Sequence, residues 1–93
     1  MRYNLPVCAD KTVRIAQAMG LSSNDQAAVY GFIDDLLDEL DIPNSLSEIG
    51  VPADCERRIS EKAMQDSATG TNPRPTNLDD MRRIVSQVIT KAR

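Results

Sequence analysis

The sequence predicts an all-α fold, a small bundle of four main helices plus a short helical turn. Apolar residues recur at the 3.6-residue helical period in several separate stretches. No stretch is a candidate for a strand. Aromatic residues are scarce, with two tyrosines and one phenylalanine, so a core has to be built from Leu, Ile, Val, Met and Ala, which suits helix packing.

The clearest stretch is DQAAVYGFIDDLLDEL, residues 25–40, in which one continuous apolar stripe runs through positions 28, 29, 32, 33, 36, 37 and 40. Acidic residues occupy the opposite, solvated face: Asp34, Asp35, Asp38 and Glu39. Ser23 is expected to cap this helix with Gln26 as its capping-box partner. The helix is expected to stop at Ile42-Pro43, because a residue before proline is pushed out of the α region.

A helix before this one is expected to begin at Asp10, as its cap, and to run to about Met19. Gly20 would end it, since glycine adopts a positive φ at little cost. The apolar side of this helix would consist of Val13, Ile15, Ala16 and Met19.

After Pro43, the spacing of Leu46, Ile49 and Val51 predicts a short helical turn packed against the core. Pro52 suits the first turn of a third helix, because its missing N–H would be unpaired there anyway. That helix should cover Ala53 to about Asp66, with an inward side of Cys55, Ile59, Ala63 and Met64.

Residues 67–75, SATGTNPRP, are predicted to form an ordered loop, because Gly, Pro, Asn and Thr are concentrated there. The capping box Thr76-Asn-Leu-Asp79 should open the last helix. Its apolar side would be Met81, Ile84, Val85, Val88, Ile89 and Ala92. Lys91 and Arg93 would complement the helix macrodipole at its end.

The totals favour one domain, residues 1–93, near the lower size limit for a stable single core. A net charge of −3 argues against a nucleic-acid partner, which needs a basic footprint. No run approaches the roughly 18 apolar residues of a membrane span, and no signal peptide is visible. Cys8 and Cys55 are interpreted as reduced thiols of a cytoplasmic protein.

Catalytic chemistry has little support in the residues, because the chain contains no histidine. Cys8 and Cys55 have no histidine to act as base, and a zinc site would lack its third and fourth ligands. The acidic residues between 34 and 41 lack the pattern of a calcium loop and are interpreted as a solvated face. The apolar stripes exceed what a bundle of this size easily hides, which leaves a partner surface open.

The segment 69–74 carries the candidate binding residues. Backbone N–H groups there, with Arg74, could hold a phosphate, although the spacing matches no P-loop. The alternative is a structural loop in which Asn72 and Arg74 bond to neighbouring carbonyls or carboxylates.

Taken together, the pieces resemble the C-terminal part of the helical domain of iron-containing alcohol dehydrogenases, the family of lactaldehyde reductase and 1,3-propanediol dehydrogenase. The resemblance rests on MRYNLPV, a helix ending in AMG, LDIPNSLSEIGV, a helix ending in KAMQD, and DSATGTNPRP before a T-x-x-D helix. It covers essentially all 93 residues.

The resemblance implies a parent-like enzyme that uses NAD(P) and a divalent metal such as iron, held by one aspartate and three histidines upstream of the equivalent of Met1. No catalytic, cofactor-binding or metal-binding residue carries over, because the matching positions do not exist in this chain. Without the metal and the cofactor domain, neither the Lewis acid nor the hydride donor is present. By analogy only, the loop residues Thr69, Gly70, Asn72 and Arg74 would face the active-site cleft.

Two hypotheses follow. The first is a catalytically inert C-terminal helical domain of such an enzyme, as a fragment or a stand-alone derivative. The second is an independent protein-interaction or oligomerisation module derived from that domain. Both predict an exposed apolar surface, through which the chain would self-associate or bind a protein partner.

Overall fold

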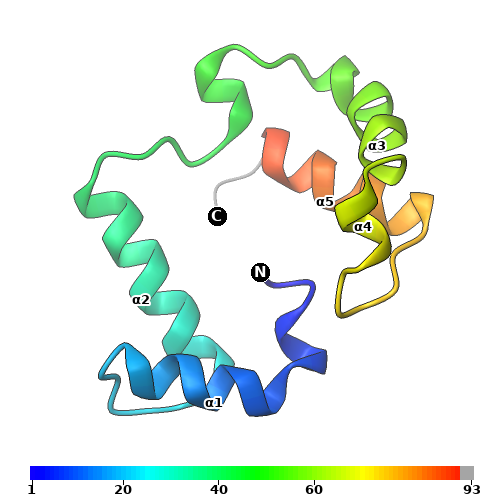
Figure 1. Ribbon diagram of the computed structural model, residues 1–93. Helices are drawn as coiled ribbons and strands as arrows, with labels where there is room; N and C mark the ends of the chain where they lie inside the picture. Colours follow the sequence, from blue (N-terminus) through cyan, green and yellow to red (C-terminus); the bar gives the residue numbers. More distant parts are fainter. Residues whose placement is uncertain (91–93) are drawn as a thin grey trace. The chain divides into compact units, whose positions relative to one another are not determined.

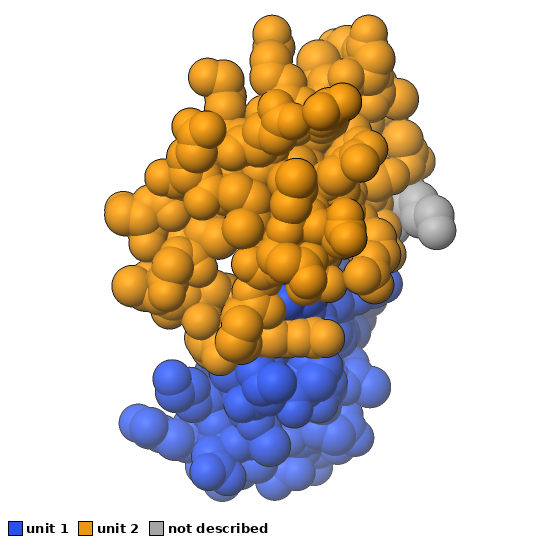
Figure 2. Space-filling view, turned by 90° about the vertical axis from the view of Figure 1, so that its right-hand side faces the viewer, with its two compact units in different colours: residues 1–42 blue, residues 43–93 orange. Residues whose placement is uncertain are grey.

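The computed structural model describes residues 1–90, and these residues form helices joined by turns, with no strand among them (Figure 1). The predicted all-α fold is therefore confirmed. Four main helices are present, and several shorter helical turns accompany them. The chain divides into two compact units, Met1–Ile42 and Pro43–Arg93, which Figure 2 draws in blue and orange. A single domain over residues 1–93 remains a prediction.

The first unit contains the 3₁₀ turn η1 (Leu5–Val7) and the helices α1 (Ala9–Ala18) and α2 (Gln26–Glu39), and α1 packs against α2. Its buried residues are Leu5, Thr12, Ala16 and Val29. The buried hydroxyl of Thr12 donates to the carbonyl of Cys8 at 2.9 Å, so this buried hydroxyl is satisfied.

Both N-terminal caps of this unit differ from the prediction. Cys8 precedes α1, and Asp10 lies inside the first turn, where its charge favours the positive end of the helix dipole. Asp25, rather than Ser23, caps α2: its carboxylate accepts from the N–H of Ala28 at 2.8 Å. A carboxylate is the stronger acceptor for that N–H, and the Ser23 hydroxyl donates to Asp25 at 3.0 Å instead.

Three helical segments end in the same way, with a residue in the left-handed region. Gly20 follows α1 with φ 71°, as predicted, and Gly50 closes a later turn with φ 93°. Asp41 takes this conformation after α2 with φ 54°. There the N–H of Ile42 bonds back to the carbonyl of Leu37 at 3.0 Å. This Schellman turn ends α2 at Glu39, before the proline restriction at Ile42-Pro43 comes into play.

The second unit contains the 3₁₀ turns η2 (Leu46–Ile49) and η3 (Ala53–Cys55), then the helices α3 (Glu56–Met64), α4 (Ser67–Gly70) and α5 (Leu78–Thr90). Helix α5 packs against α3 and contacts both 3₁₀ turns. The buried residues of this second unit are Ser60 on α3 and Val85 and Ile89 on α5. The predicted third helix thus begins as a 3₁₀ turn, with Pro52 ahead of it as the N-cap rather than in its first turn.

In the second unit, two residues predicted to pack against the core are exposed: Ile49 is 62% exposed and Val88 is 48% exposed. Periodicity locates the apolar side of a helix but not how much of that side a neighbour covers. The predicted contributions of Lys91, Ala92 and Arg93 lie outside the described residues.

The segment between α3 and α5 is also more ordered than a loop. Its first four residues form α4, because the Asp66 carboxylate accepts from the N–H of Ala68 at 2.8 Å and starts a helical turn. The capping box of α5 is shifted by one residue from the predicted Thr76–Asp79. Asn77 accepts from the N–H of Asp80 at 2.8 Å, and the Asp80 carboxylate accepts from the N–H of Asn77 at 3.4 Å.

Candidate functional site

The candidate binding residues of the sequence, Thr69, Gly70, Asn72 and Arg74, lie in the α4 turn and the segment after it. The hydroxyl of Thr69 donates to the carbonyl of Ala63 at 2.6 Å, and the side-chain amide of Asn72 donates to the carbonyl of Arg74 at 2.7 Å. These bonds fix the segment to the end of α3 and to itself. They support the structural-loop interpretation, and a cleft-facing role for the loop stays a prediction.

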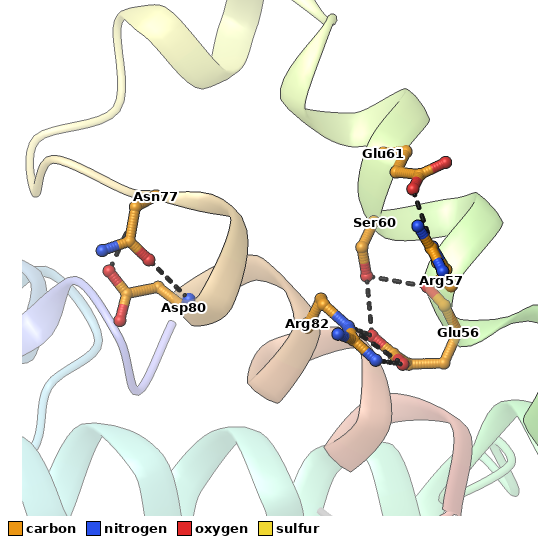
Figure 3. Close-up of polar contacts among 7 residues, drawn as sticks. All are labelled: Glu56, Arg57, Ser60, Glu61, Asn77, Asp80 and Arg82. Carbon is orange, nitrogen blue, oxygen red and sulfur yellow. Dashed lines mark hydrogen bonds and ion pairs between the residues drawn. The ribbon is translucent and has the colours of Figure 1, made fainter.

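The densest polar cluster joins α3 to α5, as Figure 3 shows. Arg82 on α5 donates from Nε to Glu56 Oε1 at 3.0 Å and from Nη2 to Glu56 Oε2 at 3.1 Å. Ser60, which is fully buried, donates to the backbone carbonyl of Glu56 at 2.7 Å and lies 3.2 Å from its Oε1. Two side chains, Arg82 from α5 and Ser60 from α3, thus meet on the carboxylate of Glu56.

Electrostatics hold this cluster in its charged form. The hydrogen bond from Arg82 lowers the pKa of Glu56, the bond from Ser60 acts in the same direction, and desolvation opposes both. The same pairing raises the pKa of Arg82. A carboxylate whose charged form is stabilised in this way is a poor general acid at neutral pH. The geometry is that of a structural contact between α3 and α5, and Glu56, Ser60 and Arg82 are called the clamp below.

The spacing of residues in the sequence does not predict this cluster. No local signal could have found it, because Glu56 and Arg82 are 26 residues apart and their helices must be paired before they meet. An open cavity of about 240 Å³ borders the clamp, and its lining residues carry two acidic and two basic side chains: Glu56, Asp79, Arg82, Arg83 and Ser86. This balance favours neither a cationic nor an anionic ligand.

In the first unit, Arg2 bridges two side chains of α2. Its guanidinium lies 5.2 Å from the centre of the Tyr30 ring, and its Nη2 lies 3.9 Å from Asp34 Oδ2. The hydroxyl of Tyr30 is buried and has no hydrogen-bond partner among residues 1–90, and burial raises the pKa of this group. Tyr30 is therefore neutral at ordinary pH, and no group among residues 1–90 accepts or donates a hydrogen bond at its hydroxyl for proton exchange.

The divalent metal implied by the family resemblance does not fit these residues. Across residues 1–90, no three side chains among His, Cys, Asp and Glu converge to hold an ion. Cys8 and Cys55 are free, half-buried thiols in different units. None of the helices between residues 1 and 90 is long and apolar enough to cross a membrane.

Large apolar side chains are exposed in both units. Those at least 37% exposed are Met1, Val7, Ile15, Phe32, Leu36, Leu40, Ile42, Ile49, Leu78 and Val88. Isolated exposed apolar residues are ordinary in soluble proteins. Among residues 1–90, the exposed large apolar side chains outnumber the buried ones, which is typical of a surface that contacts another part of a protein or a partner.

Residues 1–89 match the model of the Fe-containing alcohol dehydrogenase family, C-terminal part. The chain is 35% identical over 83 residues to choline dehydrogenase of Bacillus subtilis (strain 168), a match to 83% of this chain and 20% of that protein. It is 29% identical over 92 residues to NADPH-dependent butanol dehydrogenase of Clostridium saccharobutylicum, covering 90% of this chain and 24% of that protein. No solved structure matches significantly.

Proposed function

The chain belongs to the Fe-containing alcohol dehydrogenase family, and we propose that it is a C-terminal helical domain of such an enzyme that is catalytically inert alone. It spans about a fifth to a quarter of the length of the relatives that it matches. The observation that carries the proposal is the exposed apolar surface, which the remaining part of an enzyme would cover.

The chemistry of the chain supports inertness. The sequence contains no histidine, and the resemblance assigns three histidines to the catalytic metal. The charged groups that do converge, Glu56 and Arg82, neutralise each other and occupy the donors and acceptors that a reaction would need. In this proposal a complete enzyme would take its metal, NAD(P) and reacting groups from polypeptide outside these residues.

The proposed substrate of a complete enzyme is an alcohol or the corresponding aldehyde. The matched relatives are named as choline and butanol dehydrogenases. A closer relationship to lactaldehyde reductase or 1,3-propanediol dehydrogenase belongs to the proposal, as does a cytoplasmic location.

Titration of the purified chain with NADPH, followed by nicotinamide fluorescence, tests inertness directly. The same titration is repeated with Fe²⁺ and with Zn²⁺, and butanol oxidation is measured under each condition. We expect no saturable binding and no turnover. Saturable NADPH or metal binding, or turnover above a buffer blank, would overturn the proposal.

Light scattering over a concentration series separates this role from the alternative, an independent interaction or oligomerisation module. A domain with an uncovered interface should aggregate without a fixed stoichiometry as concentration rises. A discrete dimer or larger closed oligomer that neither NADPH nor metal perturbs would favour the alternative.

A further inference from the structure

Helix α2, together with its C-cap residue Leu40, carries an exposed apolar ridge made of Phe32, Leu36 and Leu40. Their exposed fractions are 40%, 42% and 60%. Residues four apart lie above one another on the same side of a helix, so the three side chains form one continuous line over two turns. Val29, seven residues before Leu36 and so on the same side of the helix, is fully buried, so the ridge continues the covered side of α2 towards its C-terminal end.

One side of the ridge is acidic. Asp35 follows Phe32 by three positions and Glu39 follows Leu36 by three, so each carboxylate neighbours a ridge side chain. Both are exposed. Residues 34–41 contain five acidic residues and no Lys or Arg. The ridge therefore presents an apolar line with a negative border.

The negative charge of this border distinguishes between two possible partners of the ridge, a second copy of the chain and a basic surface. In a symmetric pair of copies joined through α2, the two acidic borders would share one interface, and like charges there are unfavourable. A surface with lysine or arginine beside its apolar line would instead complement Asp35 and Glu39. Complementary charges at the edge of an apolar contact steer the encounter and select the partner.

We propose that the Phe32–Leu36–Leu40 ridge is a docking surface for a basic amphipathic helix, one whose apolar side is bordered by lysine or arginine. The inference does not depend on catalytic inertness or on cofactor chemistry. When one helix docks on another in this way, apolar side chains spaced at helical intervals make the contacts, and the ridge has this spacing.

A synthetic Leu/Lys amphipathic helix, labelled at one end, provides the probe, and a Leu/Glu helix of the same length and pattern is its control. Fluorescence anisotropy should show saturable binding of the Lys helix that weakens as salt is raised, and no binding of the Glu helix. Phe32→Ala with Leu36→Ala should weaken binding by about tenfold or more. Ile49→Ala with Val88→Ala removes exposed apolar side chains elsewhere and should leave binding unchanged.

Charge reversal tests the border. Asp35→Lys with Glu39→Lys should abolish binding of the Lys helix and create binding of the Glu helix. Asp54→Lys with Glu61→Lys changes the net charge equally but lies in the other unit, and it should do neither. Equal binding by wild type and the ridge variant would overturn the proposal, as would a dimer in light scattering that the ridge substitutions dissolve. Saturable NADPH binding would overturn inertness and leave this inference standing.

Discussion

Arg82 and Glu56 form a bidentate ion pair that links α5 to α3, with N–O distances of 3.0 and 3.1 Å. The planar guanidinium matches the carboxylate, so that two parallel hydrogen bonds form. Ser60 adds a third donor to the same carboxylate from the buried side of α3. The pair links α3 and α5 within the second unit.

The first prediction concerns the pH dependence of stability. Glu56 has a pKa below its usual 4.5 because Arg82 donates to it. A group whose pKa is lower when folded binds fewer protons in the folded state, so its stabilising effect is complete above the unfolded pKa. That effect is lost as the pH falls through the folded value. Glu56→Gln should remove this part of the acid destabilisation.

Urea unfolding between about pH 3 and pH 7 measures the effect through the change of midpoint with pH. The matched control is Glu61→Gln, which removes the carboxylate of an exposed pair within α3 whose partner, Arg57, is on the same helix. If Glu56→Gln keeps the wild-type pH dependence below pH 4.5, the pair does not contribute as its geometry indicates.

A second prediction compares two glycines that have equal space around them. A Cβ added at Gly50 or at Gly31 would meet nothing within 4 Å, so sterics cannot distinguish them. Gly50 has φ 93°, whereas Gly31 lies inside α2. Gly50→Ala should destabilise by about 1 kcal/mol because of its left-handed backbone. Gly31→Ala should stabilise by about 0.5–1 kcal/mol, since alanine favours the helix.

Thermal or urea unfolding of the two variants gives both signs in one experiment. Two changes of the same sign would show that one of these backbone conformations differs from that described. Asp41→Gly, at φ 54°, should behave as the reverse of Gly50→Ala and stabilise the end of α2.

The third prediction concerns the start of α5. Asn77 accepts from the N–H of Asp80, so Asn77→Ala should cost about 1 kcal/mol, the usual effect of losing an N-cap. Among residues 1–90, the Thr76 hydroxyl donates to the carbonyl of Arg74, at 3.2 Å, and not to a backbone N–H of α5, so Thr76→Ala should cost less than half as much. Unfolding free energies of the two variants provide the measurement. A larger loss for Thr76→Ala than for Asn77→Ala would mean that Thr76, and not Asn77, caps α5.

The fourth prediction separates buried from exposed isoleucine. Ile89 is fully buried and Ile49 is 62% exposed. Ile89→Val should destabilise by about 1 kcal/mol, because it removes a methylene from packed surroundings. Ile49→Val should change stability by less than about 0.5 kcal/mol. Comparable losses in urea unfolding would mean that Ile49 is covered in solution, for instance by another copy.

Much of the fold could be predicted from local patterns. The 3.6-residue period located the four main helices, and Gly20 ended α1 because a positive φ suits glycine. Caps were less predictable, since several polar residues in a row compete for the same N–H groups. Asp25 caps α2 in place of Ser23 because its carboxylate is the stronger acceptor for the N–H of Ala28. Asn77 caps α5 in place of Thr76 because it lies three residues before Asp80, whose N–H it accepts.

Features that depend on tertiary contacts were beyond the sequence. The partnership of Glu56 with Arg82 requires α3 and α5 to be packed together, and no spacing rule connects residues so far apart. The degree of burial was equally out of reach: Val29 and Leu36 belong to one predicted stripe, yet one is fully buried and the other is 42% exposed.

The division into Met1–Ile42 and Pro43–Arg93 has a consequence for folding speed. Each main helix pair lies within one unit: 7 residues separate α1 from α2 in the chain, and 13 separate α3 from α5. Chains dominated by such local contacts have little loop-closure entropy to overcome and fold in microseconds to milliseconds. During synthesis, the helices of Met1–Ile42 are therefore expected to form while Pro43–Arg93 is still emerging from the ribosome.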